Sequence, residues 1–361
     1  MTPSRAQELL GKSTGRRVLL VGDLMLDEWV FGTVIRISPE APIPIVHMPL
    51  TEDARVEKPG GAGNVAAILL GLGATVKVLG IVGDDERGAR LLSDLAARGA
   101  DVSAVLTDPS RPTTHKVRII AGRQQLLRID TERSDPASPS LARELRDRLA
   151  GEIGKADAVL AADYAKGALT LSSLPGELVS EVRRAGIPFC ADPKPANIEL
   201  FRGVSLISPN ESEALAASRL VGALPTARDS EIAEAAEAQA GTAIPPPVIS
   251  AGWALREKLA SEAVFVTRGE HGIAVFSGER EVTVVASQTD AGAVGDGTGC
   301  GDAVSAMSAL ALAAGAGYVE AAVLANAAGG VVSRFVGVHN PSPAEILDWL
   351  GRHPQPPAAG E

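Results

Sequence analysis

Short runs of β-branched and apolar residues alternate along the chain with longer segments rich in alanine and leucine. The short runs predict strands at Arg17–Val21, Thr75–Ile81, Ala158–Ala161, Ile187–Ala191, Leu206–Ile207 and Ala263–Thr267. The longer segments predict helices near Gly63–Leu72, Arg87–Arg98, Ser140–Ile153, Ser172–Ala185 and Glu211–Leu220. Such alternation is typical of βαβ units in a largely parallel sheet, where ligands bind beyond the carboxyl ends of the strands. The pattern therefore predicts an α/β fold with its site at that edge.

Two segments do not follow the alternation. Residues 35–48 and 113–130 are extended, rich in β-branched residues and polar at intervals. They predict a small antiparallel sheet that projects from the core and either covers a pocket or pairs with another subunit. Three consecutive prolines in Gly241–Ser250 cannot continue a helix, so this stretch predicts a loop between two helical segments. The Pro-rich residues 351–361 predict a disordered tail.

Composition narrows the class of protein. The chain has 361 residues, 45% of them hydrophobic, enough for a large core in one sizeable domain. A net charge of -10 without a basic block argues against a nucleic-acid partner and a membrane surface. The N-terminus lacks the apolar centre of a signal peptide, and no charge-free apolar run of about 18 residues occurs. With only Cys190 and Cys300, at no metal-ligand spacing, the sequence predicts a cytoplasmic protein without disulfides or zinc.

The strongest candidate for chemistry is the glycine-rich stretch GDGTGCGDAV at Gly295–Val304, which precedes an apolar run of small residues. At a helix N-terminus, the amides of Gly299, Cys300 and Gly301 would stabilise a transferring phosphate. Asp302 in the same loop is a candidate base for an attacking hydroxyl, which would make the loop a phosphoryl-transfer site. Taken alone, the loop also fits a tight turn in which Asp302 only caps the helix.

Four further motifs accompany this loop. They are GDLMLDEW at Gly22–Trp29, PGGAGNVA at Pro59–Ala66, SPNESE at Ser208–Glu213 and VTRGEHG at Val266–Gly272. Together with GDGTGCGDA at Gly295–Ala303, they resemble the ribokinase-like, or PfkB, family of carbohydrate kinases over residues 16–350. The resemblance implies a three-layer α/β/α sandwich with a mostly parallel central sheet and a small projecting β lid from segments 35–48 and 113–130. It also implies that Asp302 is the catalytic base, although the family usually has alanine in place of Cys300.

Within this family the chain is most similar to the D-glycero-β-D-manno-heptose 7-phosphate kinases. The similarity lies in RISPEAPIPIV (Arg36–Val46), KVRIIAGRQQLLRID (Lys116–Asp130), DYAKG (Asp163–Gly167) and DPKP (Asp192–Pro195). These kinases often carry a second, cytidylyltransferase-like domain with an HxGH signature, which is not found here before Glu361. The resemblance therefore implies the stand-alone kinase form, which makes the 1,7-bisphosphate in ADP-heptose and lipopolysaccharide-core synthesis.

The sugar-phosphate side of the implied site combines acidic, amide and basic groups. Contacts to sugar hydroxyls are expected after the first strand and at a helix start, from Asp23, Asp27, Gly60, Gly61 and Asn64. The substrate phosphate is expected to meet basic residues of the lid, namely Lys116, Arg118, Arg123 and Arg128. Exposed strands also carry basic residues merely to block edge pairing, so both roles stay open. Asp163 and Lys166 follow the predicted strand Ala158–Ala161. They are expected either to contact the substrate or to form local ion pairs.

The nucleotide side is implied by the remaining motifs. ATP contacts are expected from Asp192, Lys194, Asn210, Glu213, Thr267, Gly269, Gly297 and Asn326. In SPNESE, the NxxE motif would organise Mg²⁺ through water near the phosphates, and its spacing also fits a helix capping box. In some relatives a potassium-like ion binds at positions that correspond here to Asp296, Thr298, Val336 and Gly337.

The implied reaction is direct transfer of the ATP γ-phosphoryl group to the C1 hydroxyl of the heptose 7-phosphate, with Asp302 as base and Mg²⁺ on the phosphates. The lid segments imply a homodimer joined through the projecting sheets. Two alternatives stay open. One is a PfkB kinase of another sugar or sugar phosphate, and the other is a catalytically silent regulator that binds a sugar phosphate.

Overall fold

The computed structural model describes residues 1–122, 124–174, 176–222, 227–240, 243–278, 281–287, 297–335 and 337–353. Its strands are β1 (Arg17–Ile37), β2 (Pro44–His47), β3 (Arg55–Gly61), β4 (Thr75–Gly83), β5 (Leu106–Asp108), β6 (Thr114–Ala121), β7 (Gln124–Thr131), β8 (Ala158–Ala162), β9 (Phe189–Asp192), β10 (Leu206–Ile207), β11 (Ala263–Thr267), β12 (Ile273–Ser277) and β13 (Glu281–Val285).

The α-helices are α1 (Pro3–Ser13), α2 (Ala62–Gly71), α3 (Glu86–Ala97), α4 (Pro139–Ile153), α5 (Gly176–Arg184), α6 (Glu211–Leu220), α7 (Ala227–Ala240), α8 (Pro246–Leu259), α9 (Cys300–Ala313), α10 (Tyr318–Val332) and α11 (Pro343–Arg352). Short 3-10 helices lie at Glu52–Ala54, Pro195–Phe201 and Gly269–His271. Among the described residues, no helix combines the length and apolar character that a membrane span requires.

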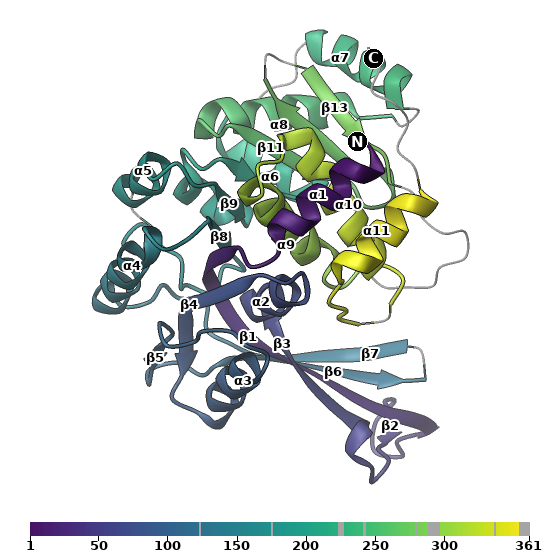
Figure 1. The fold of residues 1–361 in the computed structure, drawn as a ribbon. Coiled ribbons are helices and arrows are strands. Elements are labelled where there is room, and N and C mark those ends of the chain that lie inside the picture. The colour runs from purple at the N-terminus through teal and green to yellow at the C-terminus, as the bar shows by residue number, and fades with distance from the viewer. Residues whose placement is uncertain are drawn as a thin grey trace.

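The central sheet has the strand order β13-β12-β11-β10-β9-β8-β1-β4-β5 (Figure 1). Its strands are parallel from β11 to β5, and only β12 and β13 join antiparallel at one edge. This mostly parallel sheet confirms the α/β fold predicted from the alternation of strands and helices.

Alternate residues of each central strand are buried in two different apolar clusters. In β1, Val18 and Leu20 belong to a cluster with α1, α2, α3, α9, α10 and α11, whereas Leu19 and Val21 belong to one with α4 to α8. Both faces of the sheet are therefore covered by helices, which makes the three layers of the sandwich.

The long strand β1 carries the chain from the central sheet into the lid. Its first part, Arg17–Asp23, pairs with β4 and β8, and its continuation pairs with β3, β6 and β2. The lid contains β2, β6 and β7, which fall in the two segments expected from sequence, and in addition β3 and the part of β1 that follows Asp23. It projects from the sandwich (Figure 1). The prediction that the strand ends at Val21 was wrong, because the polar residues Asp23 and Asp27 that follow are buried and accept hydrogen bonds from Tyr164 and Arg118.

Two predicted boundaries also differ. The helix α8 begins at Pro246, inside the predicted loop 241–250, because proline at the first positions of a helix removes no intrahelical hydrogen bond. At the other end, α11 continues to Arg352, into the predicted tail, and residues 354–361 lie outside the described part of the chain.

Candidate active site

Asp302 lies in the first turn of α9, where Gly299 as N-cap adopts a left-handed backbone conformation with φ of 81°. One carboxylate oxygen accepts a hydrogen bond from the Tyr164 hydroxyl and the other from the Asn64 side-chain amide, each at 2.5 Å. Burial raises the pKa of Asp302, and both hydrogen bonds act against that rise. Two donors therefore favour the ionised form that a general base requires.

The side chain of Asn64 has a second polar atom beside the nitrogen that donates to Asp302. Its side-chain oxygen is buried and has no hydrogen-bond partner among the described residues. Burying an acceptor without a partner costs about 1–3 kcal/mol, so this oxygen is suited to a hydroxyl of a bound ligand. A Cβ on Gly299 would lie 3.2 Å from the Asn64 side-chain nitrogen, so glycine there serves both the backbone conformation and the close approach.

The predicted phosphate-stabilising amides lie at the N-terminus of α9. Gly301 is exposed there, while the Cys300 amide donates a long hydrogen bond of 3.3 Å to the Gly297 carbonyl oxygen. The Cys300 thiol donates to the Gly329 carbonyl oxygen at 3.5 Å, so the side chain points toward α10. Gly297 and Thr298 immediately precede the helix, and Asp296 and Val336 lie outside the described residues.

Asp23, predicted to contact a sugar, lies within β1 and faces the loop after β8. Its carboxylate accepts hydrogen bonds from the backbone amides of Tyr164, Lys166 and Ala168 at 2.9–3.0 Å. Burial raises the pKa of Asp23 in spite of these bonds. In this structure the carboxylate holds the DYAKG loop in place.

Asp27 follows Asp23 along β1 and lies in the part of the strand that belongs to the lid. It accepts a hydrogen bond of 2.6 Å from Arg118, whose guanidinium carbon lies 5.0 Å from the centroid of the Trp29 ring. The paired strand β3 brings Gly60 so close that a Cβ there would lie 2.2 Å from an Asp27 carboxylate oxygen. Gly61 follows as the N-cap of α2, the helix that carries Asn64. The four predicted residues Asp27, Gly60, Gly61 and Asn64 thus form one continuous wall.

Of the predicted basic residues of the lid, Lys116, Arg118 and Arg128 gather on one face, each paired with a carboxylate. Arg123 lies outside the described residues. Arg118 and Arg128 are cross-strand neighbours on β6 and β7, as are Lys116 and Asp130. Arg128 and Lys116 both contact Asp130 at 2.8–3.0 Å. Glu132 joins Lys116 to Lys166, with distances of 2.9 and 2.7 Å. This group, here called the lid network, comprises Asp27, Lys116, Arg118, Arg128, Asp130, Glu132 and Lys166.

The loops after β8 and β9 are held together by Asp163. Its buried carboxylate accepts hydrogen bonds from the Ala165 and Lys194 amides and from the Asn197 side chain, at 2.8–3.0 Å. Asp163 was expected to contact the substrate or to have a local role, and in this structure its oxygens accept hydrogen bonds from these backbone and side-chain donors.

Lys194 forms an ion pair with Glu213, and its Nζ atom lies 5.7 Å from the centroid of the Tyr164 ring. Glu213 also closes a capping box with Asn210 at the start of α6, which confirms the capping geometry expected from SPNESE. The carboxyl of Asp192 has no hydrogen-bond partner among the described residues, and burial raises its pKa to about 8. Asp192 and Glu213 offer the oxygen ligands that Mg²⁺ prefers, and the ion pair and cap on Glu213 favour contact through water.

The remaining predicted nucleotide residues flank the β11–β12 turn and β13. Thr267 ends β11 and forms an isolated parallel β-bridge with Asn210. Gly269, two residues later, has a φ of 55°. Asn326 on α10 donates to the Ala286 carbonyl oxygen at 2.9 Å and so supports the chain just after β13. Among the described residues, no cluster of three His, Cys, Asp or Glu side chains suited to a metal ion occurs.

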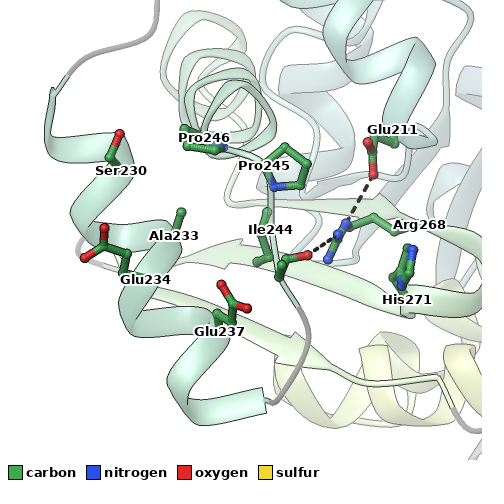
Figure 2. A pocket seen from close by; sticks show the side chains of 11 residues that line it. Glu211, Ser230, Ala233, Glu234, Glu237, Ile244, Pro245, Pro246, Arg268 and His271 are labelled. Atoms are coloured by element: carbon green, nitrogen blue, oxygen red, sulfur yellow. Dashed lines mark hydrogen bonds and ion pairs between the residues drawn. The ribbon is translucent and has the colours of Figure 1, made fainter.

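A separate pocket of about 570 Å³ lies beside the nucleotide-side loops, between α7 and the β11–β12 turn (Figure 2). Its wall includes Pro245 and Pro246, for which the sequence predicted only a loop. Arg268 is buried there, donating to Glu211 at 3.2 Å and to the Ala243 carbonyl oxygen, while its Nη1 atom has no partner in the described part of the chain.

Three residues of the candidate site were not predicted from the sequence. Tyr164, Asp130 and Glu132 each contact a predicted residue directly. Asp130 and Tyr164 lie inside motifs that the sequence analysis quoted. The residues next to them in the sequence do not indicate which side chains they contact in the fold.

Known proteins resemble the chain over almost its whole length. The sequence profile described as "pfkB family carbohydrate kinase" matches residues 30–345. A protein named bifunctional protein HldE from Geobacter sulfurreducens is 38% identical over 351 residues, which is 97% of this chain and 66% of that protein. The HldE protein from Bradyrhizobium diazoefficiens is also 38% identical, over 92% of this chain and 62% of its own length. The chain thus spans about two thirds of the curated relatives it matches.

Solved structures agree in fold. Arabidopsis thaliana ribokinase complexed with ribose and ATP has a TM-score of 0.65 at 21% identity, covering 93% of this chain and 99% of that one. Phosphofructokinase-2 from Escherichia coli in complex with potassium has a TM-score of 0.67 at 18% identity, covering 94% and 99%. The fold is therefore ribokinase-like. The chain belongs to the pfkB family of carbohydrate kinases, enzymes that transfer a phosphoryl group to a sugar hydroxyl.

Proposed function

We propose that this kinase phosphorylates the C1 hydroxyl of D-glycero-β-D-manno-heptose 7-phosphate with ATP, in the synthesis of an ADP-heptose for lipopolysaccharide core. The observation that carries the proposal is the lid network, in which three cationic side chains of the lid and Lys166 of the loop after β8 gather near Asp27. A kinase of an unphosphorylated sugar has no need of these cations. The similarity to HldE proteins supports a heptose as the sugar.

The charges of the lid network suit a remote phosphate. Its four cations, Lys116, Arg118, Arg128 and Lys166, face three carboxylates, so the network carries a net charge of about +1. A phosphate dianion offers the same cations stronger, charge-assisted hydrogen bonds. It would replace Asp130 and Glu132 as the partner of Lys116, Arg128 and Lys166, and Arg118 would contact it while paired with Asp27.

Asp302 would act on the other end of the sugar. As the C1 oxygen forms a bond to the γ-phosphorus, its proton passes to the Asp302 carboxylate, and the bond from that phosphorus to the β-phosphate oxygen breaks to release ADP. The exposed N-terminus of α9 would stabilise the charge on the transferring group. Asn64, with its free side-chain oxygen, would hold a sugar hydroxyl near the base.

Mg²⁺ fits the oxygen donors near the ends of β9 and β10, where Asp192 and Glu213 would hold it through water. Bound there, the ion would neutralise phosphate charge during transfer. Lys194, already paired with Glu213, would add a positive charge directed at the nucleotide phosphates.

The lid also supports a homodimer. Strand register places Val117, Ile119, Leu127 and Ile129 on the face opposite Arg118. Leu127 and Ile129 are 49% and 53% exposed, and an exposed apolar patch on a projecting sheet indicates a surface that a partner covers. We infer that a second copy of the lid covers it.

A coupled ADP-release assay with Mg-ATP and a panel of sugar phosphates tests the substrate. Selective turnover of the heptose 7-phosphate is expected. Preference for a fructose phosphate would replace the substrate but keep the mechanism, and stabilisation by a sugar phosphate without ADP release would favour a silent regulator.

A further inference from the structure

Tyr164 contacts the candidate base directly, and no role was predicted for it. Its hydroxyl donates to one Asp302 oxygen at 2.5 Å, opposite the bond from Asn64 to the other oxygen. We propose that Tyr164 is a positioning residue, which holds the Asp302 carboxylate in the orientation that accepts the proton of the sugar hydroxyl. The proposal rests on the function proposed above.

Tyr164 is itself fixed at three points. Its backbone amide donates to Asp23 at 2.9 Å, and the following amide of Ala165 donates to Asp163 at 2.8 Å. Ala165 adopts a positive φ of 55°, which only strongly held non-glycine residues do. The Lys194 ammonium lies 5.7 Å from the centroid of the phenol ring, within range of a cation–π contact. The hydroxyl is therefore held in place before any ligand binds.

A phenol is suited to this position because it remains a donor. Burial, followed by the nearby charges of Asp302 and Asp192, raises the pKa of Tyr164 well above its usual value. The group therefore stays protonated over the working range of a kinase. Each Asp302 oxygen has two lone pairs, and each already accepts one hydrogen bond, so one lone pair per oxygen is left for the incoming hydroxyl.

The same contact bears on the protonation of Asp302. The charged groups facing it are Asp27 from β1, which opposes ionisation, and Lys194 after β9, which favours it. Asp192 at the end of β9 is a third, and its repulsion with Asp302 disfavours two charges together. Among these influences the Tyr164 hydrogen bond is the largest that favours the ionised carboxylate. Its removal should leave more of the base protonated at neutral pH.

The test is Tyr164→Phe, which keeps the ring and its contacts and removes the hydroxyl alone. We expect kcat at neutral pH to fall about 10- to 100-fold, the acid limb of the kcat–pH profile to move to higher pH, and the KM for ATP to stay unchanged. The second tyrosine supplies a matched control, because Tyr318 also donates to a carboxylate, Glu262 at 2.7 Å, away from the site. Tyr318→Phe should leave both kcat and the profile as in the wild type.

A second measurement is independent of turnover. Infrared difference spectra against Asp302→Asn report protonation of the Asp302 carboxyl, which should occur at higher pH in Tyr164→Phe than in the wild type. If this shift appears while neither protein turns over any sugar phosphate, the proposed function fails and the Tyr164 contact stands. An unshifted titration, or an unchanged kcat and acid limb in an active enzyme, overturns the inference.

Discussion

Two acidic side chains of the candidate site, Asp302 and Asp192, lie in similar surroundings. Both are half-buried near other carboxylates, and burial raises the pKa of each. They differ in their contacts, because Asp302 accepts two hydrogen bonds and Asp192 accepts none from the described residues. These contacts suit Asp302 to the proposed role of base and Asp192 to the proposed binding of a cation.

Asp302→Asn should abolish most of the activity and leave binding intact. The amide keeps the shape of the side chain but cannot take the proton, so kcat should fall by about 10²- to 10⁴-fold. Calorimetric titration should find ATP and sugar-phosphate affinities close to those of the wild type. Near-normal turnover in this variant would exclude Asp302 as the base.

Asp192 predicts a pH-dependent stability in the absence of ligands. The folded protein holds the Asp192 proton up to a pKa of about 8, whereas the unfolded chain releases it near its ordinary value of 3.8. Between these values the folded state binds more protons, so stability falls as pH rises from about 4 to about 8. Asp192→Asn cannot ionise and should lack this fall. Its melting temperature relative to the wild type should therefore increase from pH 5 to pH 8, and a constant difference would contradict the assignment.

Sequence reasoning at the residue scale succeeded where the relevant structure is local. The Asn210–Glu213 capping box and the helix that starts at Cys300 depend on a few adjacent residues. It did not anticipate that the Asp23 and Asp163 carboxylates accept hydrogen bonds from loop amides, because all of these amides except that of Ala165 belong to segments far away in the chain. The sequence places an acid just after a predicted strand in each case, and only the fold shows which groups donate hydrogen bonds to it.

At the scale of elements, β1 connects the loop that contacts Asp302 with the lid network. Asp23 supports the loop that carries Tyr164, and Asp27 in the same strand meets the lid cation Arg118. The prediction of a short first strand missed this connection. Asp23, Asp27 and Glu28 looked like loop residues, whereas pairing with β3 and β6 buries them.

Arg118→Gln should weaken recognition of the sugar phosphate more than the chemical step. Loss of one charge-assisted contact of about 1.5–3 kcal/mol should raise the KM for the sugar phosphate about 10- to 100-fold, with the KM for ATP little changed. Arg55→Gln is the matched control, because Arg55 pairs with Glu28 on the opposite face of the lid and is 64% exposed. Equal effects of the two substitutions on the KM for the sugar phosphate would show that the lid network does not select the phosphate.

At the scale of the whole molecule, the lid has two faces with different chemistry. One carries the lid network, and the other exposes Leu127 and Ile129. The sequence predicted the lid from its extended segments. It could not assign the faces, because this requires the register between β1, β6 and β7.

The double variant Leu127→Glu with Ile129→Glu should dissociate the dimer, because charges would be buried in its apolar contact. Sedimentation velocity should find a dimer for the wild type and a monomer for this variant. Leu220→Glu, at a residue that is 66% exposed on α6, is the control and should remain dimeric. A monomeric wild-type protein would remove the proposed interface.

The central claim is that the lid network and Asp302 act on opposite ends of one sugar phosphate. Phosphorus NMR of the product formed from D-glycero-β-D-manno-heptose 7-phosphate and Mg-ATP tests it most directly. The expected product is a bisphosphate with the new group on the C1 oxygen and the original 7-phosphate unchanged. A new phosphate at any other position, or no transfer to this sugar, would contradict it.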